Sequence, residues 1–314
     1  MPRAWACTPD NEGMTSERKA LTGAAFATLL LIAFMMGANH VAARLAFNHG
    51  VDVVTAVSVR SSLTTVVVGF LIWQHQVPWG TTVRQKKFLL AIGALIAVQS
   101  VCLYSAVARL PVALALLAFN TYPLATALWA RILYGHQAER AVILAMPLML
   151  GGLALALDVF GAASGLGAAA QWREIGEGIA FALAASATFG LAMVLTEHEA
   201  LDLDGRLRTF STMGLVALLA ISGALSQDGF HWPTALAGWW GLAALSFLYG
   251  TAFTIMFTVL PKLGVVGNSA IMNVEPVFAL VLAWALLGQS IALMQLVGAL
   301  LVVATVVGLG LRKR

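Results

Sequence analysis

One pattern occurs twice in this chain of 314 residues, at a constant distance of 153 positions. The first copy runs over 109–135 and the second over 262–288, and each carries an Asn-x-x-Pro motif inside an apolar run. The two motifs are Asn120 to Pro123 and Asn273 to Pro276. A fixed offset through several uncommon residues is typical of an internal repeat. The chain is therefore predicted to fold as two copies of one unit.

The composition indicates a membrane protein. Hydrophobic residues make up 60% of the chain and charged residues only 10%, whereas soluble domains carry roughly 25% charged residues. The 18 Lys and Arg are scattered between apolar segments, so we expect no nucleic-acid partner. The two cysteines, Cys7 and Cys102, have no metal-binding spacing. We therefore expect neither a metal site nor a cofactor.

Ten apolar segments follow a polar tail at 1–22, in which we see no signal peptide. Most of them reach the ~20 residues that a helix needs to cross a bilayer. An all-α membrane protein with ten transmembrane helices is the predicted fold class. The segments lie at about 23–46, 52–73, 88–109, 111–133, 140–158, 177–196, 209–226, 237–260, 264–287 and 291–311.

The distribution of basic residues predicts the orientation. With the N-terminus inside, only Arg44, Arg60, Arg109 and Arg173 of the 18 Lys and Arg fall in the outer half. Cytoplasmic loops carry the excess of Lys and Arg. Both termini and the tail 1–22 are thus predicted to be cytoplasmic, in a bacterial-type inner membrane.

Each repeat contains five spans, so the second repeat must enter the membrane from the opposite side. The first repeat is predicted at 23–158 and the second at 177–311. The Gly- and Ala-rich segment 159–176 between them is predicted to be a periplasmic linker. The fold is therefore expected to be two inverted five-helix repeats.

The prolines of the repeated motif weaken two helices at membrane depth. Pro123 and Pro276 each lack a backbone donor and free the carbonyl one turn earlier. Asn120 and Asn273 lie three residues before them, on the same helix face. These amides either bind substrate or satisfy the freed carbonyl groups. Transporters build midplane binding sites from interrupted helices of this kind, at the interface of two repeats.

The chain resembles the EamA-type transporters of the drug/metabolite transporter superfamily. The motifs that carry the resemblance are Gly37-x-Asn39, N-T-Y-P-L from Asn120 and N-V-E-P-V-F-A-L from Asn273. His136 and Gln289 stand where that family usually has a Glu. The resemblance implies export or exchange of small metabolites, commonly amino acids, without ATP. It also implies a central cavity lined by the first, third, fourth, sixth, eighth and ninth spans.

Glu275 is the only acidic residue near the middle of a predicted span. An ionised group there costs about 3 kcal/mol or more before it finds a partner. It is a candidate for proton coupling or cation binding, and the alternative is a neutral or paired structural Glu. Its repeat counterpart is Tyr122, so the two half-sites are chemically unequal.

Several polar residues lie within other spans. Asn39 and His40 fall in the outer half of the first span, where a histidine is either a ligand or structural. Arg60, about two turns into the second span, could pair with a substrate carboxylate, but we expect it to snorkel outward. Further candidates for cavity walls are Gln99, Tyr104 and Tyr249, with Trp129, Phe253 and Trp284.

The predicted function is secondary active transport of small polar metabolites by alternating access, as an exporter or exchanger. Protons are the candidate coupling ion, and a monomer or weak dimer surrounded by membrane lipid is expected. One alternative is an intramembrane enzyme, which needs a nucleophile with a base or metal ligands at membrane depth; the sequence contains no such motif. The other is a scaffold or sensor that moves no solute.

Overall fold

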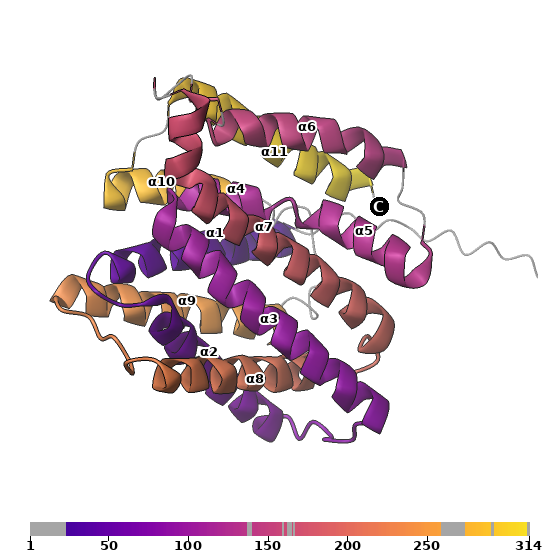
Figure 1. Ribbon diagram of the computed structural model, residues 1–314. Helices are drawn as coiled ribbons and strands as arrows, with labels where there is room; N and C mark the ends of the chain where they lie inside the picture. The colour runs from indigo at the N-terminus through magenta and orange to yellow at the C-terminus, as the bar shows by residue number, and fades with distance from the viewer. Residues whose placement is uncertain are drawn as a thin grey trace, which may run out of the picture.

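The computed structural model describes residues 23–136, 140–158, 160–161, 165, 167–258, 274–289 and 292–312. This part of the chain is helical, and Figure 1 shows its helices stacked across one another in a single bundle. The helices are α1 (Gly23–Phe47), α2 (Val53–Gln74), α3 (Val83–Arg109), α4 (Val112–Phe119), α5 (Tyr122–Tyr134), α6 (Arg140–Ala156), α7 (Ala168–Glu199), α8 (Gly205–Ser226), α9 (Leu236–Thr258), α10 (Glu275–Leu287) and α11 (Leu293–Arg312).

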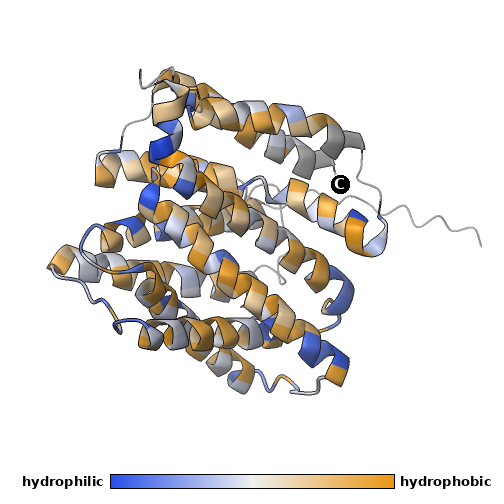
Figure 2. Cartoon of the chain, in the orientation of Figure 1, coloured by the Kyte–Doolittle hydropathy of each residue, from blue (hydrophilic) through white to orange (hydrophobic). Residues whose placement is uncertain are grey.

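Ten apolar segments are present among these helices. Seven are long and apolar enough to cross a membrane, with α4 and α5 together forming one of them. Three shorter apolar segments lie in α6, α10 and α11. Large apolar side chains are exposed on the outside of the bundle, for example Val66, Phe70 and Trp240. Figure 2 shows hydrophobic residues along the length of the helices. In a soluble protein such surfaces would be unfavourable, whereas lipid accommodates them. The predicted class of an all-α, multi-pass membrane protein is confirmed.

The predicted repeat is confirmed by the ends of individual helices. Adding 153 to the bounds of α5, Tyr122–Tyr134, gives 275–287, which are the bounds of α10. Both helices have Pro as their second residue and end at a left-handed glycine, Gly135 with φ 68° and Gly288 with φ 65°. Glycine adopts this conformation without the steric cost of a side chain. The same local sequence therefore makes the same helix twice.

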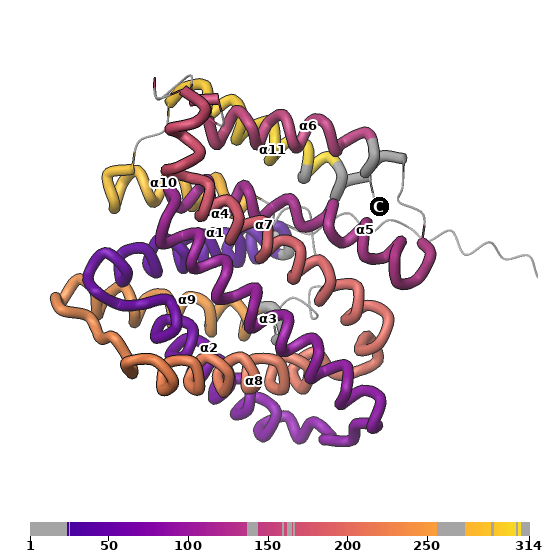
Figure 3. Tube along the Cα trace, in the orientation of Figure 1, coloured from indigo at the N-terminus to yellow at the C-terminus, as the bar shows by residue number. Residues whose placement is uncertain are grey.

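The packing of the helices follows an approximate two-fold axis. The offset relates α3 to α9, α7 to α1 and α5 to α10. Accordingly α3 packs on α7 as α9 packs on α1, and α5 packs on α7 as α10 packs on α1. Two helix pairs, α2 with α8 and α6 with α11, consist of helices related to each other, and Figure 3 shows α6 and α11 side by side along one edge. Two inverted five-helix repeats account for this arrangement.

Two equivalent glycines allow the close crossings between the repeats. A Cβ atom at Gly37 of α1 would lie 2.9 Å from the carbonyl oxygen of Glu275 in α10. At Gly190 of α7, the equivalent position, it would lie 2.8 Å from the backbone nitrogen of Thr126 in α5. Small residues let membrane helices approach backbone to backbone. Gly37 thereby brings the start of α10 against the C-terminal half of α1.

The fourth predicted span is interrupted rather than only kinked. α4 ends at Phe119 and α5 begins at Tyr122, so Asn120 and Thr121 lie between them. Both the backbone nitrogen and the side-chain amide of Asn120 donate to the carbonyl of Leu116, at 2.9 Å. Asn120 therefore terminates α4 by satisfying one of its last carbonyl groups.

Two helices begin at least five residues earlier than predicted. α3 starts at Val83 instead of about 88, because Thr82 and Gln85 form a capping box at its first turn. α7 starts at Ala168 instead of about 177, so part of the segment predicted as a linker is helical. Both helices continue through polar residues beyond the apolar core, which hydropathy alone does not detect.

Candidate functional site

A cluster of polar side chains lies buried between α1, α2, α3, α9 and α10. We call it the Arg60 cluster; its members are Asn39, His40, Arg60, Ser100, Tyr104, Tyr249 and Glu275. It is sealed on most sides, because Asn39 is 0%, His40 3%, Arg60 4% and Tyr104 1% exposed. Only the Glu275 side chain retains substantial exposure, at 22%. Buried polar groups of this kind are costly in a membrane and mark substrate or ion sites.

Arg60 is the centre of the cluster. Its Nη1 donates to the hydroxyl of Tyr104 at 3.2 Å, and its Nη2 donates to the hydroxyl of Ser100 at 3.0 Å. The guanidinium carbon lies 4.1 Å from the ring centre of Tyr249 and 4.8 Å from that of Tyr104. Tyr104 in turn donates to Oδ1 of Asn39 at 3.1 Å. These contacts fix the charged group between two aromatic faces, which attract a cation.

The prediction that Arg60 snorkels outward is therefore wrong. Its side chain is directed into the bundle because α3 and α9 supply two hydroxyl acceptors and two ring faces there. The resemblance also implied a cavity without the second span, whereas α2 contributes this central residue.

His40 and Glu275 form the second part of the cluster. The Nε2 atom of His40 lies 3.3 Å from Oε1 of Glu275, and the His40 ring packs against Tyr104 at 5.5 Å between ring centres. Glu275 is the first residue of α10. The unpaired backbone N–H groups at a helix start favour a negative charge. The carboxylate thus sits where both a helix terminus and an imidazole can interact with it.

Several buried polar atoms of α1 and α2 have no hydrogen-bond partner among the residues that the structure describes. They include Nδ2 of Asn39, Nδ1 of His40, Nε of Arg60 and the hydroxyls of Ser58 and Ser61. Ser58 and Ser61 lie on α2, on either side of Arg60 in sequence. An unsatisfied buried polar group costs about 1–3 kcal/mol. Each such group calls for an explanation, and binding of a polar ligand would provide one.

The cluster is not repeated in the second half of the chain. At the 153-residue offset, Asn39 corresponds to Ala192, His40 to Met193 and Arg60 to Met213. Gln99 and Ser100 correspond to Ala252 and Phe253. Met213 nevertheless borders the site, since the hydroxyl of Tyr249 lies 3.9 Å from its sulfur. The fold is symmetric, but its polar chemistry lies mainly in the first repeat.

The remaining candidate residues lie in different places. Gln99 adjoins the cluster, where its Oε1 accepts from Ser100 at 3.4 Å. Tyr122 packs between Phe119 and Phe189, with 5.0 Å between the ring centres of Tyr122 and Phe189. Asn120 caps α4, as described above. Pro123 and Pro276 occupy the first turns of α5 and α10. Asn273 lies outside the described residues.

Sequence reasoning missed Ser100, although a signal was present. Ser100 and Tyr104 are four residues apart in an apolar helix and so lie on one face. The face carries two hydroxyl groups, and both accept bonds from Arg60.

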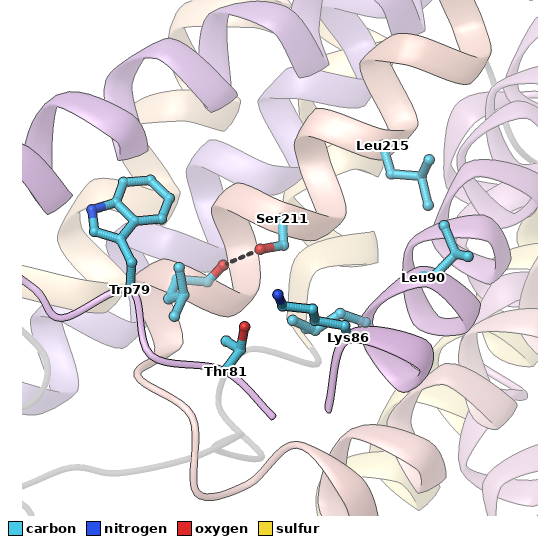
Figure 4. A pocket seen from close by; sticks show the side chains of 8 residues that line it. Trp79, Thr81, Lys86, Leu90, Ser211 and Leu215 are labelled. Atoms are coloured by element: carbon cyan, nitrogen blue, oxygen red, sulfur yellow. Dashed lines mark hydrogen bonds between the residues drawn. The ribbon is translucent and has the colours of Figure 1, made fainter. Parts of the chain in front are cut away.

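At the opposite end of α3, near the predicted inner surface, an ionic contact joins three helices. Arg84 Nη2 lies 2.7 Å from Oε2 of Glu199, and the hydroxyl of Tyr134 donates to Oε1 at 3.1 Å. Close to it is a shallow pocket of about 300 Å³ between the α2–α3 connection and α8. Figure 4 shows Trp79, Lys86 and Ser211 on its walls. The pocket is open and its charged residue, Lys86, is exposed, so the buried Arg60 cluster is the better candidate site.

Gln289, at the family's usual Glu position, has a structural partner. Its Oε1 accepts a bond from the backbone nitrogen of Val112 at 3.0 Å. α4 has no side-chain cap of its own, because Pro111 precedes it. An amide oxygen from the second repeat thus caps a helix of the first.

Comparisons with known proteins agree with this architecture. The model of the EamA-like transporter family matches residues 23–157 and again 176–311. One crystal structure of a protein is similar over 92% of this chain and 98% of its own, with 17% identity and a TM-score of 0.57. That likeness concerns the fold alone. Comparison with curated proteins gives no match. Because the family model covers both repeats, the chain belongs to the EamA-like transporter family.

Proposed function

We propose that this protein is a secondary active transporter of small polar metabolites, such as amino acids, and that its substrate binds at the Arg60 cluster. The observation that carries the proposal is a sealed, unsatisfied polar site built by helices of both repeats. Asn39 and Arg60 come from the first repeat, and Tyr249 and Glu275 from the second. A site between inverted repeats can face either side when one repeat moves against the other. The family membership supports transport as the activity.

The low exposure of the cluster fits alternating access. In the described conformation a solute cannot reach Arg60, which is 4% exposed. Access requires α1 and α10 to separate from their neighbours. Glu275 retains the greatest exposure in the cluster, so the route is proposed to begin beside the start of α10. We expect export or exchange, in a bacterial-type inner membrane with both termini cytoplasmic.

Proton coupling is proposed for the His40–Glu275 pair. The two side chains lie 3.3 Å apart, which is within the distance of an ion pair. The other charged and titratable groups that face this pair are Arg60 from α2, Tyr104 from α3 and Tyr249 from α9. Motion of α10 away from α1 would break the pair, so protonation and conformation are linked. The coupling requires Glu275 to gain and lose a proton during each cycle.

The test replaces Glu275 by Gln, which keeps the shape of the side chain but fixes it neutral. Purified Glu275→Gln in proteoliposomes should still exchange labelled amino acids across the membrane. It should no longer accumulate them under a pH gradient. Glu174→Gln is the matched control, because Glu174 is exposed at the start of α7. Gradient-driven accumulation by Glu275→Gln at the wild-type level would contradict proton coupling through this residue.

A further inference from the structure

We propose that the transported substrate carries a carboxylate, and that the guanidinium of Arg60 is the group that binds it. This inference rests on the proposed transport function and adds the chemical class of the substrate.

The first argument is charge. Arg60 is 96% buried, yet among the described residues no carboxylate lies within ion-pair distance of it. Its partners are the neutral hydroxyls of Ser100 and Tyr104, and Glu275 contacts His40 instead. Buried cations are normally paired, since an unpaired charge in low dielectric is unfavourable. An anionic ligand would complete the pairing.

The second argument is the type of the unsatisfied atoms. A guanidinium has five N–H donors, and two of them are engaged, which leaves three. Among the described residues the Nε of Arg60 has no partner, and neither has Nδ2 of Asn39. Both of these groups can only donate. These two donors therefore lack acceptors, and an ionised carboxylate supplies about four acceptor positions and no donor.

The third argument is shape. The rings of Tyr249 and Tyr104, at 4.1 and 4.8 Å, hold the guanidinium while its Nε atom remains unused. The planar fork of Arg matches a carboxylate in a bidentate manner. Phosphate also fits such a fork, but a phosphate dianion would bring two charges to a cluster whose only permanent cation among the described residues is Arg60. One guanidinium balances one carboxylate.

The test uses matched solutes that differ only in their charged groups. Wild-type proteoliposomes are assayed by counterflow with labelled L-serine, serinamide, ethanolamine and 3-hydroxypropanoate. L-phenylalanine, phenylalaninamide, phenethylamine and 3-phenylpropanoate form a second set for apolar side chains. Exchange of the amino acid with slow exchange of its amide and amine is expected. Exchange of the deaminated acid as well would show that the carboxylate suffices, whereas its exclusion would add the amine as a second requirement.

Substitutions of Arg60 test whether its guanidinium binds the carboxylate. Loss of a buried charged partner weakens binding by 2–5 kcal/mol, so Arg60→Gln should lower the apparent affinity for the carboxylate by roughly 30-fold or more. Arg60→Lys should retain part of the affinity for the carboxylate. Arg131→Gln, which removes an exposed arginine at the end of α5, should leave that affinity unchanged. If Arg60→Gln does not fold, labelling of wild-type Arg60 by p-hydroxyphenylglyoxal is followed by peptide mass analysis. The exchanged acids should protect Arg60, and the amides and amines should not.

The outcomes separate the two proposals. Equal exchange of acid and amide, or full carboxylate transport by Arg60→Gln, would overturn the role of Arg60 and leave the transport function standing. The absence of exchange for every solute, with no protection of Arg60, would count against the proposed function itself.

Discussion

The hydroxyl of Tyr104 should contribute more to stability than any other tyrosine hydroxyl bond described here. It accepts from Arg60 at 3.2 Å and donates to Asn39 at 3.1 Å, in a residue that is 1% exposed. Tyr104→Phe keeps the ring that faces the guanidinium. It leaves one Arg60 N–H and the Oδ1 of Asn39 without partners, and water cannot reach them.

The magnitude follows from these two bonds. Interhelical hydrogen bonds in membranes contribute about 0.6 kcal/mol on average, so two give about 1.2 kcal/mol. A bond to a charged group is worth about 1.5–3 kcal/mol, and one of the two donors is the Arg60 cation. We therefore expect Tyr104→Phe to lower the free energy of unfolding by about 1–4 kcal/mol.

Tyr134→Phe is the matched control. Its hydroxyl also donates one 3.1 Å bond, to Glu199, but the Glu199 carboxylate keeps its 2.7 Å contact with Arg84 when that bond is lost. We expect a loss below about 1 kcal/mol there. Unfolding of both variants is measured in the same detergent by titration with SDS and by heating. Equal stability of the two variants, or a Tyr104→Phe protein as stable as wild type, would refute the assignment of the Arg60 network.

Three further predictions concern the scaffold. Gly37→Val and Gly190→Val should each destabilise the fold by about 1–3 kcal/mol through overpacking, whereas Gly151→Val, with open space at its Cβ position, should be neutral in the same unfolding assay. The hydrogen bond from Arg206 lowers the pKa of Asp204, the N-cap of α8, so its stabilising effect should be complete above about pH 4 and be lost as the pH falls through the lowered pKa. Amide exchange in the first turn of α8 tests this; exchange that slows on acidification beyond the intrinsic rate would contradict it. Single-cysteine tags near Lys86 and Arg206 should report the cytoplasm, and tags near Ala168 and Gly229 the periplasm; a cytoplasmic signal at Ala168 would contradict the predicted orientation.

Most of the fold was predictable because it depends on two strong regularities. Apolar segments of about 20 residues indicate membrane helices, and the 153-residue offset indicates their repetition. The starts of α3 and α7 were not predicted correctly, because the polar residues that follow Thr82 and Gly167 fail an apolar criterion. A capping box extends α3, and the helix propensity of Ala168 to Ala170 favours the earlier start of α7.

The polar residues of the site could be predicted from the sequence, but the contacts between them could not. Asn39, His40, Tyr104 and Glu275 stand out as polar side chains in apolar spans, and the structure brings all four together. The direction of Arg60 depends on which hydroxyls and rings the neighbouring helices present, and a single helix does not contain that information. Its distance of two turns from the helix end allows either orientation.

The difference between the two repeats explains why the repeated motif was an incomplete guide to the site. An offset identifies residues that both halves share, and those residues build crossings and helix ends, as Gly37 with Gly190 and Gly135 with Gly288 do. A site for one small substrate needs one set of polar groups, because a second buried cation would add a cost of about 3 kcal/mol without a second ligand to bind. Met213 at the position of Arg60 avoids that cost while keeping the volume filled beside Tyr249. In an inverted repeat of this kind, the polar residues that break the symmetry therefore point to the proposed binding site, and the residues that keep it point to the shared scaffold.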